Sequence, residues 1–202
     1  MNEQLNDIKM IREMMEKSSK FISLSGLSGV VAGATAIIGA AFAYLYLLRD
    51  PAATQYTRMQ ELMILLVDAL VVLTISIIFA LLLSRKKAKK NNQPLFNKIT
   101  LKMLFNLSIP LMTGGIFSLI FLLRGEVNLV VSATLLFYGL ALINASKYTY
   151  NEIHHLGIVE IILGLLAALL PHNGIIFWTI GFGLCHILYG CIMHFKYDRV
   201  KS

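Results

Sequence analysis

Charged residues are scarce in this sequence, and hydrophobic residues are abundant. Asp, Glu, Lys and Arg make up 14% of the 202 residues, whereas 57% are hydrophobic. A typical soluble domain is about 25% charged and about 45–50% apolar. The composition therefore excludes an ordinary soluble globular protein and favours a lipid bilayer as the solvent. The first twenty residues also lack the apolar core of a cleavable signal peptide, which predicts that the first spanning helix acts as its own insertion signal.

The patterns of several enzyme and cofactor classes are missing too. There is no nucleophile elbow and no phosphate-binding loop, and no two histidines have the i, i+4 spacing of a helical zinc pair or of an HxxxH membrane hydrolase. The two cysteines, Cys185 and Cys191, lie off a common helix face, which predicts free thiols. A bis-histidine haem is disfavoured, because His186 has no histidine counterpart near its expected mid-membrane depth.

What the sequence does contain is long apolar segments. A hydrocarbon core of about 30 Å is crossed by about 20 apolar residues in a helix. Six segments meet that length, and their short connections divide them into three helical hairpins. We therefore predict an all-α integral membrane bundle over residues 21–196, followed by a tail at 197–202. The predicted spans are 21–48, 61–84, 101–123, 127–146, 153–170 and 174–195.

Residues 1–20 are predicted to form an amphipathic cytoplasmic helix, because Leu5, Ile8, Ile11 and Met15 recur at helical spacing among charged residues. Such a helix could lie on the membrane, cap the bundle or pair with a second copy.

The basic residues predict the orientation of the bundle. Of the 18 Lys and Arg residues, only Arg49, Arg58 and Arg124 fall on the side opposite both predicted termini. Lys and Arg accumulate in cytoplasmic loops, so both termini are expected in the cytoplasm. The densest basic run, Arg85 to Lys90, is expected to contact anionic lipid headgroups. It has no aromatic or motif context that would indicate nucleic acid as a partner.

The first span carries small residues at four-residue spacing, namely Ser25, Gly29 and Gly33. Small residues let two helix backbones approach closely in a membrane. They could pack within the chain or form the seam of a homo-oligomer.

Polar residues within the spans are the candidates for function. Asp68 lies about two turns inside the second span, and an acid there usually faces the bundle interior or water. In the third span, Pro110 followed by Gly114 and Gly115 predicts a kink or a broken helix, which could line a substrate path or serve helix packing alone. In the fourth span, Tyr138 and Asn144 are expected to make interhelical hydrogen bonds.

The last hairpin holds all five histidines, both cysteines and Glu160. Three interpretations stay open. His154, His155, Glu160 and His194 could bind a transition metal through imidazole and carboxylate ligands. Glu160 could exchange a proton with His186 or His194, because histidine changes charge within the physiological pH range. The histidines could also be ordinary headgroup residues, with Glu160 a buried, hydrogen-bonded acid.

Residues 156–190, LGIVEIILGLLAALLPHNGIIFWTIGFGLCHILYG, resemble the hairpin repeat of the HdeD-like family of small bacterial membrane proteins. The segments FYGLALINASKY (137–148) and FGLCHILYGCIMHFKY (182–197) also resemble each other. The family resemblance implies six helices in three hairpins, a bacterial inner-membrane location and an association with acid resistance.

These features favour a small transporter or stress-related membrane module that binds a proton, an ion or a small ligand. The alternatives are a metal-dependent intramembrane enzyme and a structural or signalling partner protein.

Overall fold

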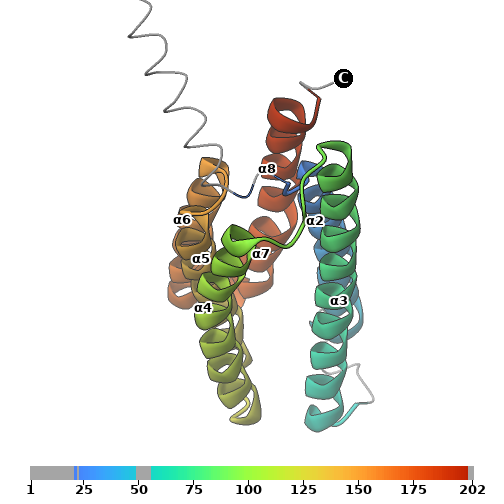
Figure 1. The fold of residues 1–202 in the computed structure, drawn as a ribbon. Helices are drawn as coiled ribbons and strands as arrows, with labels where there is room; N and C mark the ends of the chain where they lie inside the picture. Colours follow the sequence, from blue (N-terminus) through green and yellow to red (C-terminus); the bar gives the residue numbers. More distant parts are fainter. Residues whose placement is uncertain (1–20, 22, 49–55, 200–202) are drawn as a thin grey trace, which may run out of the picture.

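The structure is a computed structural model that describes residue 21, residues 23–48 and residues 56–199. The predicted amphipathic helix at 1–20 and the residue Arg49 lie outside the described residues. Every regular element in the described part is a helix (Figure 1), and six helices are long and apolar enough to cross a membrane. The prediction of an all-helical chain with six such segments is therefore confirmed.

We refer to these six candidate membrane helices as spans. The first five are α2 (Gly26–Ala43, continued by a π-helical turn at Tyr44–Leu48), α3 (Arg58–Lys90), α4 (Lys98–Leu123), α5 (Val127–Ser146) and α6 (Asn151–Leu169). The last span runs from Pro171 to Asp198. It joins a 3-10 turn (Pro171–Asn173), α7 (Gly174–Trp178), the π-helical segment η3 (Thr179–Cys185), α8 (His186–Met193) and a final π-helical turn (His194–Asp198).

Local sequence signals explain where two long helices begin. Thr57 starts α3 with a capping box, in which its side chain accepts from the Gln60 backbone N–H and Gln60 reaches back to the Thr57 backbone. Asn97 starts α4 by accepting from the backbone N–H groups of Ile99 and Thr100 at 2.9 and 2.8 Å. These caps supply acceptors for N–H groups that the first turn of a helix leaves without partners.

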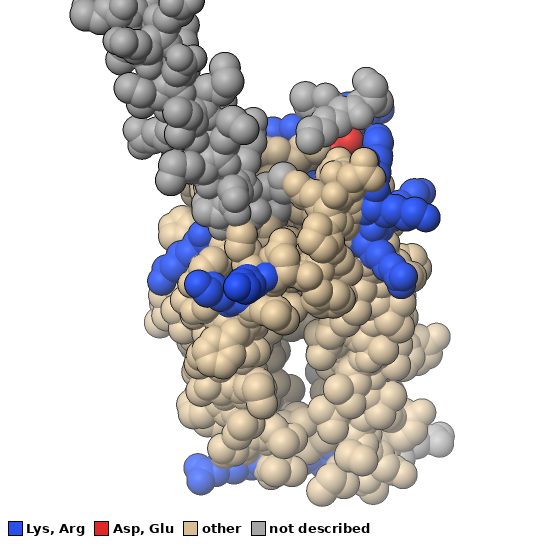
Figure 2. All heavy atoms as spheres, in the orientation of Figure 1, with Lys and Arg blue, Asp and Glu red and all other residues tan. Residues whose placement is uncertain are grey.

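The helices form two groups joined by the last span (Figure 1). In one group α5 packs against both α4 and α6, and in the other α2 packs against α3 and against η3 and α8 of the last span. Among the described elements, α3 packs extensively against α2 alone. Figure 2 shows an opening between the two groups. At the start of α3, the Arg58 side chain crosses to the other group and donates a 2.8 Å hydrogen bond to the carbonyl oxygen of Gly125.

Glycines bring α5 and α6 into close contact. A methyl group on Gly139 would lie 2.6 Å from the carbonyl oxygen of Gly157, and one on Gly157 would lie 2.7 Å from the carbonyl oxygen of Gly139. The side chains of Ile161 and Ile143 cover the two glycines. A side chain at either glycine would therefore force the helices apart.

The small residues predicted as a seam in the first span face the last span of the same chain. Gly29 lies against Gly190, and Gly33 lies against Gly183 and Ile187. Packing within the chain therefore uses this face of α2, and a homo-oligomer through Ser25, Gly29 and Gly33 stays a prediction.

Pro110 lies inside α4, which is one continuous helix from Lys98 to Leu123. Of the two outcomes expected at this proline, the break is excluded and the kink stays a prediction. Proline has no N–H for the carbonyl oxygen four residues earlier, here that of Asn106. The side chain of Asn144 in α5 donates a 2.8 Å hydrogen bond to that oxygen. The predicted interhelical role of Asn144 is confirmed, and its partner is the carbonyl that Pro110 leaves free.

Basic side chains gather at the end of the bundle where α3 ends and α4 begins, and few lie at the opposite end (Figure 2). The end of α3 contributes Arg85, Lys86, Lys87, Lys89 and Lys90. The two ends of the bundle thus differ in charge in the way that the sequence predicts.

Candidate functional site

A buried acid, a histidine and a tyrosine meet where α5, α6 and the last span pack together. Glu160 comes from α6, Tyr138 from α5 and His186 from the start of α8. The exposed fraction is 0% for Glu160 and 7% for His186. We refer to Tyr138, Glu160 and His186 as the buried cluster.

The hydrogen bonds of His186 define its proton positions. Its Nδ1 lies 2.9 Å from the carbonyl oxygen of Gly181, and its Nε2 lies 2.7 Å from the hydroxyl of Tyr138. A carbonyl can only accept, so Nδ1 carries a proton, and in the neutral ring Nε2 accepts from the hydroxyl. A hydroxyl can also accept, so the Tyr138 hydroxyl can accept a hydrogen bond from Nε2 once Nε2 carries a proton. His186 can therefore hold one or two protons without changing partners.

Glu160 lacks such partners. Its Oε1 lies 3.4 Å from Nδ1 of His186, close enough for charges to interact. Neither carboxyl oxygen has a hydrogen-bond partner in the described part of the chain. An ionised carboxylate without donors is costly in an apolar environment, so its charge depends on His186. Glu160 either carries a proton itself or faces a protonated imidazole.

The backbone beside the buried cluster is a π-helix. The segment η3 spans Thr179–Cys185, and its Gly181 lies directly against the carboxyl group of Glu160 and the side chain of Leu135. A residue with a Cβ at this position would compete with the carboxyl group for space. Single π-helical turns inside α-helices frequently occur at functional sites, and His186 directly follows this one.

A second charged cluster lies at the basic end of the bundle. Lys87 of α3 contacts Asp198 at 2.6 Å and donates to the carbonyl oxygen of Leu24 at 2.7 Å and to the hydroxyl of Tyr150 at 3.2 Å. Burial raises the pKa of the Tyr150 hydroxyl, so Tyr150 stays neutral and accepts this hydrogen bond. We refer to this group as the end cluster.

Asp198 completes the end cluster by capping α2. Its Oδ2 accepts from the backbone N–H of Gly26 at 3.0 Å and from the hydroxyl of Ser25 at 3.4 Å, and it lies 3.2 Å from Nδ1 of His194. A carboxylate at a helix N-terminus is favourable, because the helix dipole and the free N–H groups attract negative charge. Asp198 therefore ties the C-terminal end of the last span to the start of α2.

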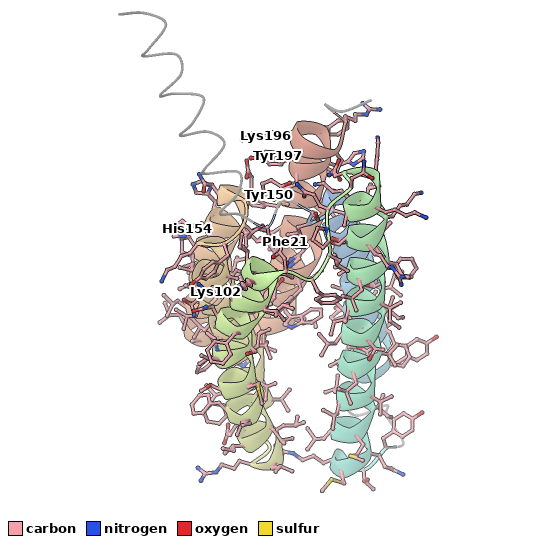
Figure 3. The ribbon with its side chains drawn as sticks, viewed as in Figure 1. Phe21, Lys102, Tyr150, His154, Lys196 and Tyr197 are labelled. Atoms are coloured by element: carbon pink, nitrogen blue, oxygen red, sulfur yellow. The ribbon has the colours of Figure 1, made fainter. Side chains whose placement is uncertain are left out.

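Glu152 also joins helix ends. It accepts from Lys196 at 2.7 Å and from the hydroxyl of Tyr197 at 3.0 Å. Figure 3 shows Lys196, Tyr197 and Tyr150 near one another at this end, whereas His154 lies off to the side on α6. The contact ties the start of α6 to the end of the last span.

The structure does not assemble the predicted metal ligands. His154 and His155 are exposed on α6, Glu160 faces His186, and His194 faces Asp198. Within the described ranges, no three His, Cys, Asp or Glu side chains are grouped closely enough to hold a metal ion. The four residues diverge because the side chains at His154, His155 and Glu160 leave α6 in different directions, and His194 points toward the start of α2.

Asp68 lies apart from the buried cluster. It is half-buried on α3 beside Gly39 of α2, where a larger residue would approach its carboxylate. Thr74, six residues further along α3, donates to the carbonyl oxygen of Leu70 in its own helix. Asp68 and Glu160 therefore belong to different parts of the molecule.

Sequence reasoning predicted Glu160 with His186 as one of two possible proton pairs, the other being Glu160 with His194, but two residues of the end cluster were missed. It expected an interhelical hydrogen bond from Tyr138, which is confirmed, without identifying His186 as its partner. Lys87 and Asp198 were not singled out. The available signal was that Asp198 is the sole acid near a basic terminus and lies one turn after His194.

Comparisons with protein-family models, with curated proteins and with solved structures find no match to this chain.

Proposed function

We propose that this chain is a multi-pass integral membrane protein that binds and releases a proton at Glu160 and His186, and that it acts as a small proton-linked transporter. The observation that carries the proposal is the fully buried carboxyl group of Glu160, which lies 3.4 Å from His186 and has no hydrogen-bond donor in the described structure. Acids inside membrane spans usually face a partner or a transport path.

The chemistry follows from the partners of the buried cluster. With one proton on Glu160 and a neutral His186, the cluster carries no net charge. The other state without net charge is a carboxylate facing an imidazolium. It forms when Glu160 loses its proton and Nε2 of His186, the ring nitrogen that carries none, gains a proton; Tyr138 can partner either form of the ring. The unfavourable state is the carboxylate beside a neutral imidazole. The cluster therefore favours holding a proton, and it releases the proton when a conformational change admits water.

The membrane setting is part of the same proposal. Six helices are long and apolar enough to cross a bilayer, and the excess of Lys and Arg at one end supports an orientation with both termini in the cytoplasm. The resemblance of residues 156–190 to the HdeD-like hairpin supports a bacterial inner membrane and a role in acid stress.

Proton flux into liposomes tests the proposal. We expect the purified protein to collapse an imposed pH gradient, reported by an enclosed pH-sensitive dye, with valinomycin and potassium present to balance charge. Glu160→Gln keeps the size of the side chain but cannot release a proton. This variant is expected to lower the flux to that of protein-free liposomes.

Glu152→Gln provides the matched control, because Glu152 lies on the same helix but is held by Lys196 and Tyr197. This variant is expected to keep the flux. Infrared difference spectra between neutral and alkaline pH add a readout of proton binding itself. Glu160 is expected to hold its proton at neutral pH, so the loss of a protonated carboxyl band at alkaline pH should be missing only in Glu160→Gln. The proposal would be overturned if Glu160→Gln kept both the proton flux and the infrared change of the carboxyl band.

A further inference from the structure

The basic end of the bundle contains a cavity that is lined by positively charged residues on one side and by apolar residues on the other. Its volume is about 380 Å³, within the range of about 300–1,000 Å³ typical of ligand sites, and it lies between the start of α2, the end of α3 and the end of the last span. The lining residues are Ser25, Leu27, Leu83, Lys86, Lys87, Lys90, Asn91, His194, Tyr197 and Asp198.

The charged wall of the cavity is positive. Lys86 and Lys90 are exposed, lie one helical turn apart on one face of α3, and form no ion pair with any described residue. The carboxylate of Asp198 is already matched by Lys87, by the N–H of Gly26 and by His194. The ammonium groups of Lys86 and Lys90 are therefore available to an anion.

The other wall is apolar and lies toward the membrane-spanning part of the helices. Leu83 is one helical turn before Lys87 on α3, and Leu27 is in the first turn of α2, where 42% of its surface is exposed. Positive and apolar walls together match a ligand with an anionic head and a hydrocarbon chain. The position, where apolar spans give way to basic residues, is the level of lipid headgroups.

We propose that this cavity binds an anionic phospholipid, with its phosphate between Lys86 and Lys90 and its acyl chains leaving along Leu27 and Leu83. The site requires the proposed membrane location but not the proposed proton chemistry. It also distinguishes among the basic residues of the run, because Arg85 and Lys89 do not line the cavity. General attraction of a basic surface to an anionic membrane would make no such distinction.

Native mass spectrometry of the full-length protein, released from vesicles of equal phosphatidylglycerol and phosphatidylcholine, tests the site. We expect wild type to retain phosphatidylglycerol in preference to phosphatidylcholine. Lys86→Ala with Lys90→Ala should weaken retention about 30-fold, from about 1 kcal/mol per basic residue. Arg85→Ala with Lys89→Ala removes the same charge from the same turn of α3 and should retain the lipid.

Further variants distinguish a specific lipid site from misfolding and from general surface attraction. Lys86→Arg with Lys90→Arg should restore retention, which shows that loss in the alanine variant is not misfolding. Glu160→Gln should retain lipid, which separates this site from the proton proposal. Equal loss in both alanine double variants would overturn the site in favour of general surface attraction, and no loss in either would also overturn it. Displacement of the lipid by millimolar inorganic phosphate would reassign the cavity to a free anion.

Discussion

The two acids at the centres of the two clusters have opposite surroundings. Asp198 is matched by a lysine, a histidine, a hydroxyl and a helix N-terminus. Glu160 is more deeply buried. Among the described residues it has one ion-pair partner, His186, and no hydrogen bond to either carboxyl oxygen. Oδ1 of Asp198 has the Lys87 ammonium group at 2.6 Å and its Oδ2 accepts hydrogen bonds, whereas no described residue donates to either carboxyl oxygen of Glu160.

From this difference we propose a structural role for Asp198 and a functional one for Glu160. A carboxylate held by several donors stabilises the contact between elements and gains little from changing its protonation state. A buried carboxyl group without donors contributes little to stability, and its charge state is sensitive to a single neighbour. We therefore expect changes in the end cluster to affect mainly folding and changes in the buried cluster to affect mainly proton exchange.

The largest loss of stability is expected for Lys87→Met. This change removes the partner of a mostly buried Asp198 and the donor to Leu24 and Tyr150. Breaking a buried ion pair by removing one partner costs about 3–5 kcal/mol, and we expect about 3 kcal/mol here because Asp198 keeps its other donors. Reversible unfolding in mixed micelles of dodecyl maltoside and increasing dodecyl sulfate measures the effect.

Lys89→Met is the control for Lys87→Met, because Lys89 is exposed on the same turn of α3. This variant should change the free energy of unfolding by less than about 0.5 kcal/mol. A similar small effect for Lys87→Met would show that the end cluster does not hold the helices together.

An intermediate loss is expected for Gly181→Ala. The added methyl group would lie 2.7 Å from the Leu135 side chain and would also press on the carboxyl group of Glu160. Overpacking of a closed interior costs about 1–3 kcal/mol. The same unfolding titration measures this loss, and the infrared carboxyl band should shift because the surroundings of Glu160 change.

Gly115→Ala provides the comparison, since no atom lies within 4 Å of the added methyl group. Alanine is favoured over glycine inside a helix by about 1 kcal/mol, so this variant should be neutral or slightly more stable. Equal behaviour of the two alanine variants would mean that Glu160 lies in loose rather than close packing.

Much of the fold follows from the sequence because span length and apolar content are local properties. All six predicted segments correspond to helices, and the span 127–146 has the same limits as α5. The first span was predicted to begin at residue 21, but α2 begins at Gly26. The reason is a tertiary contact: the backbone of Phe21 bonds to Tyr148, and Thr149 donates to its carbonyl oxygen.

The partners of polar residues were harder to predict, because they depend on which helix faces meet. The similarity between 137–148 and 182–197 has a physical counterpart, since Gly139 with Ile143 and Gly183 with Ile187 each pack against a glycine and isoleucine of another helix. The π-helical segment η3 directly precedes His186 in the last span, and His186 lies beside Glu160 whereas His194 lies beside Asp198. No periodicity in the sequence indicates such a π-helical segment.

Glu160→Gln should have the largest effect on proton flux, but we expect it to have the smallest effect on stability. If Glu160 carries a proton, Glu160→Gln replaces one neutral group by another of equal size, and the free energy of unfolding should change by less than about 0.5 kcal/mol. Asp198→Asn, made alongside it, should cost about 1–3 kcal/mol because several charge-assisted hydrogen bonds weaken. Both values come from the same unfolding titration. A loss above about 2 kcal/mol for Glu160→Gln would instead show that an ionised Glu160 pairs with a protonated His186 as a structural contact, and the contrast between the two acids would disappear.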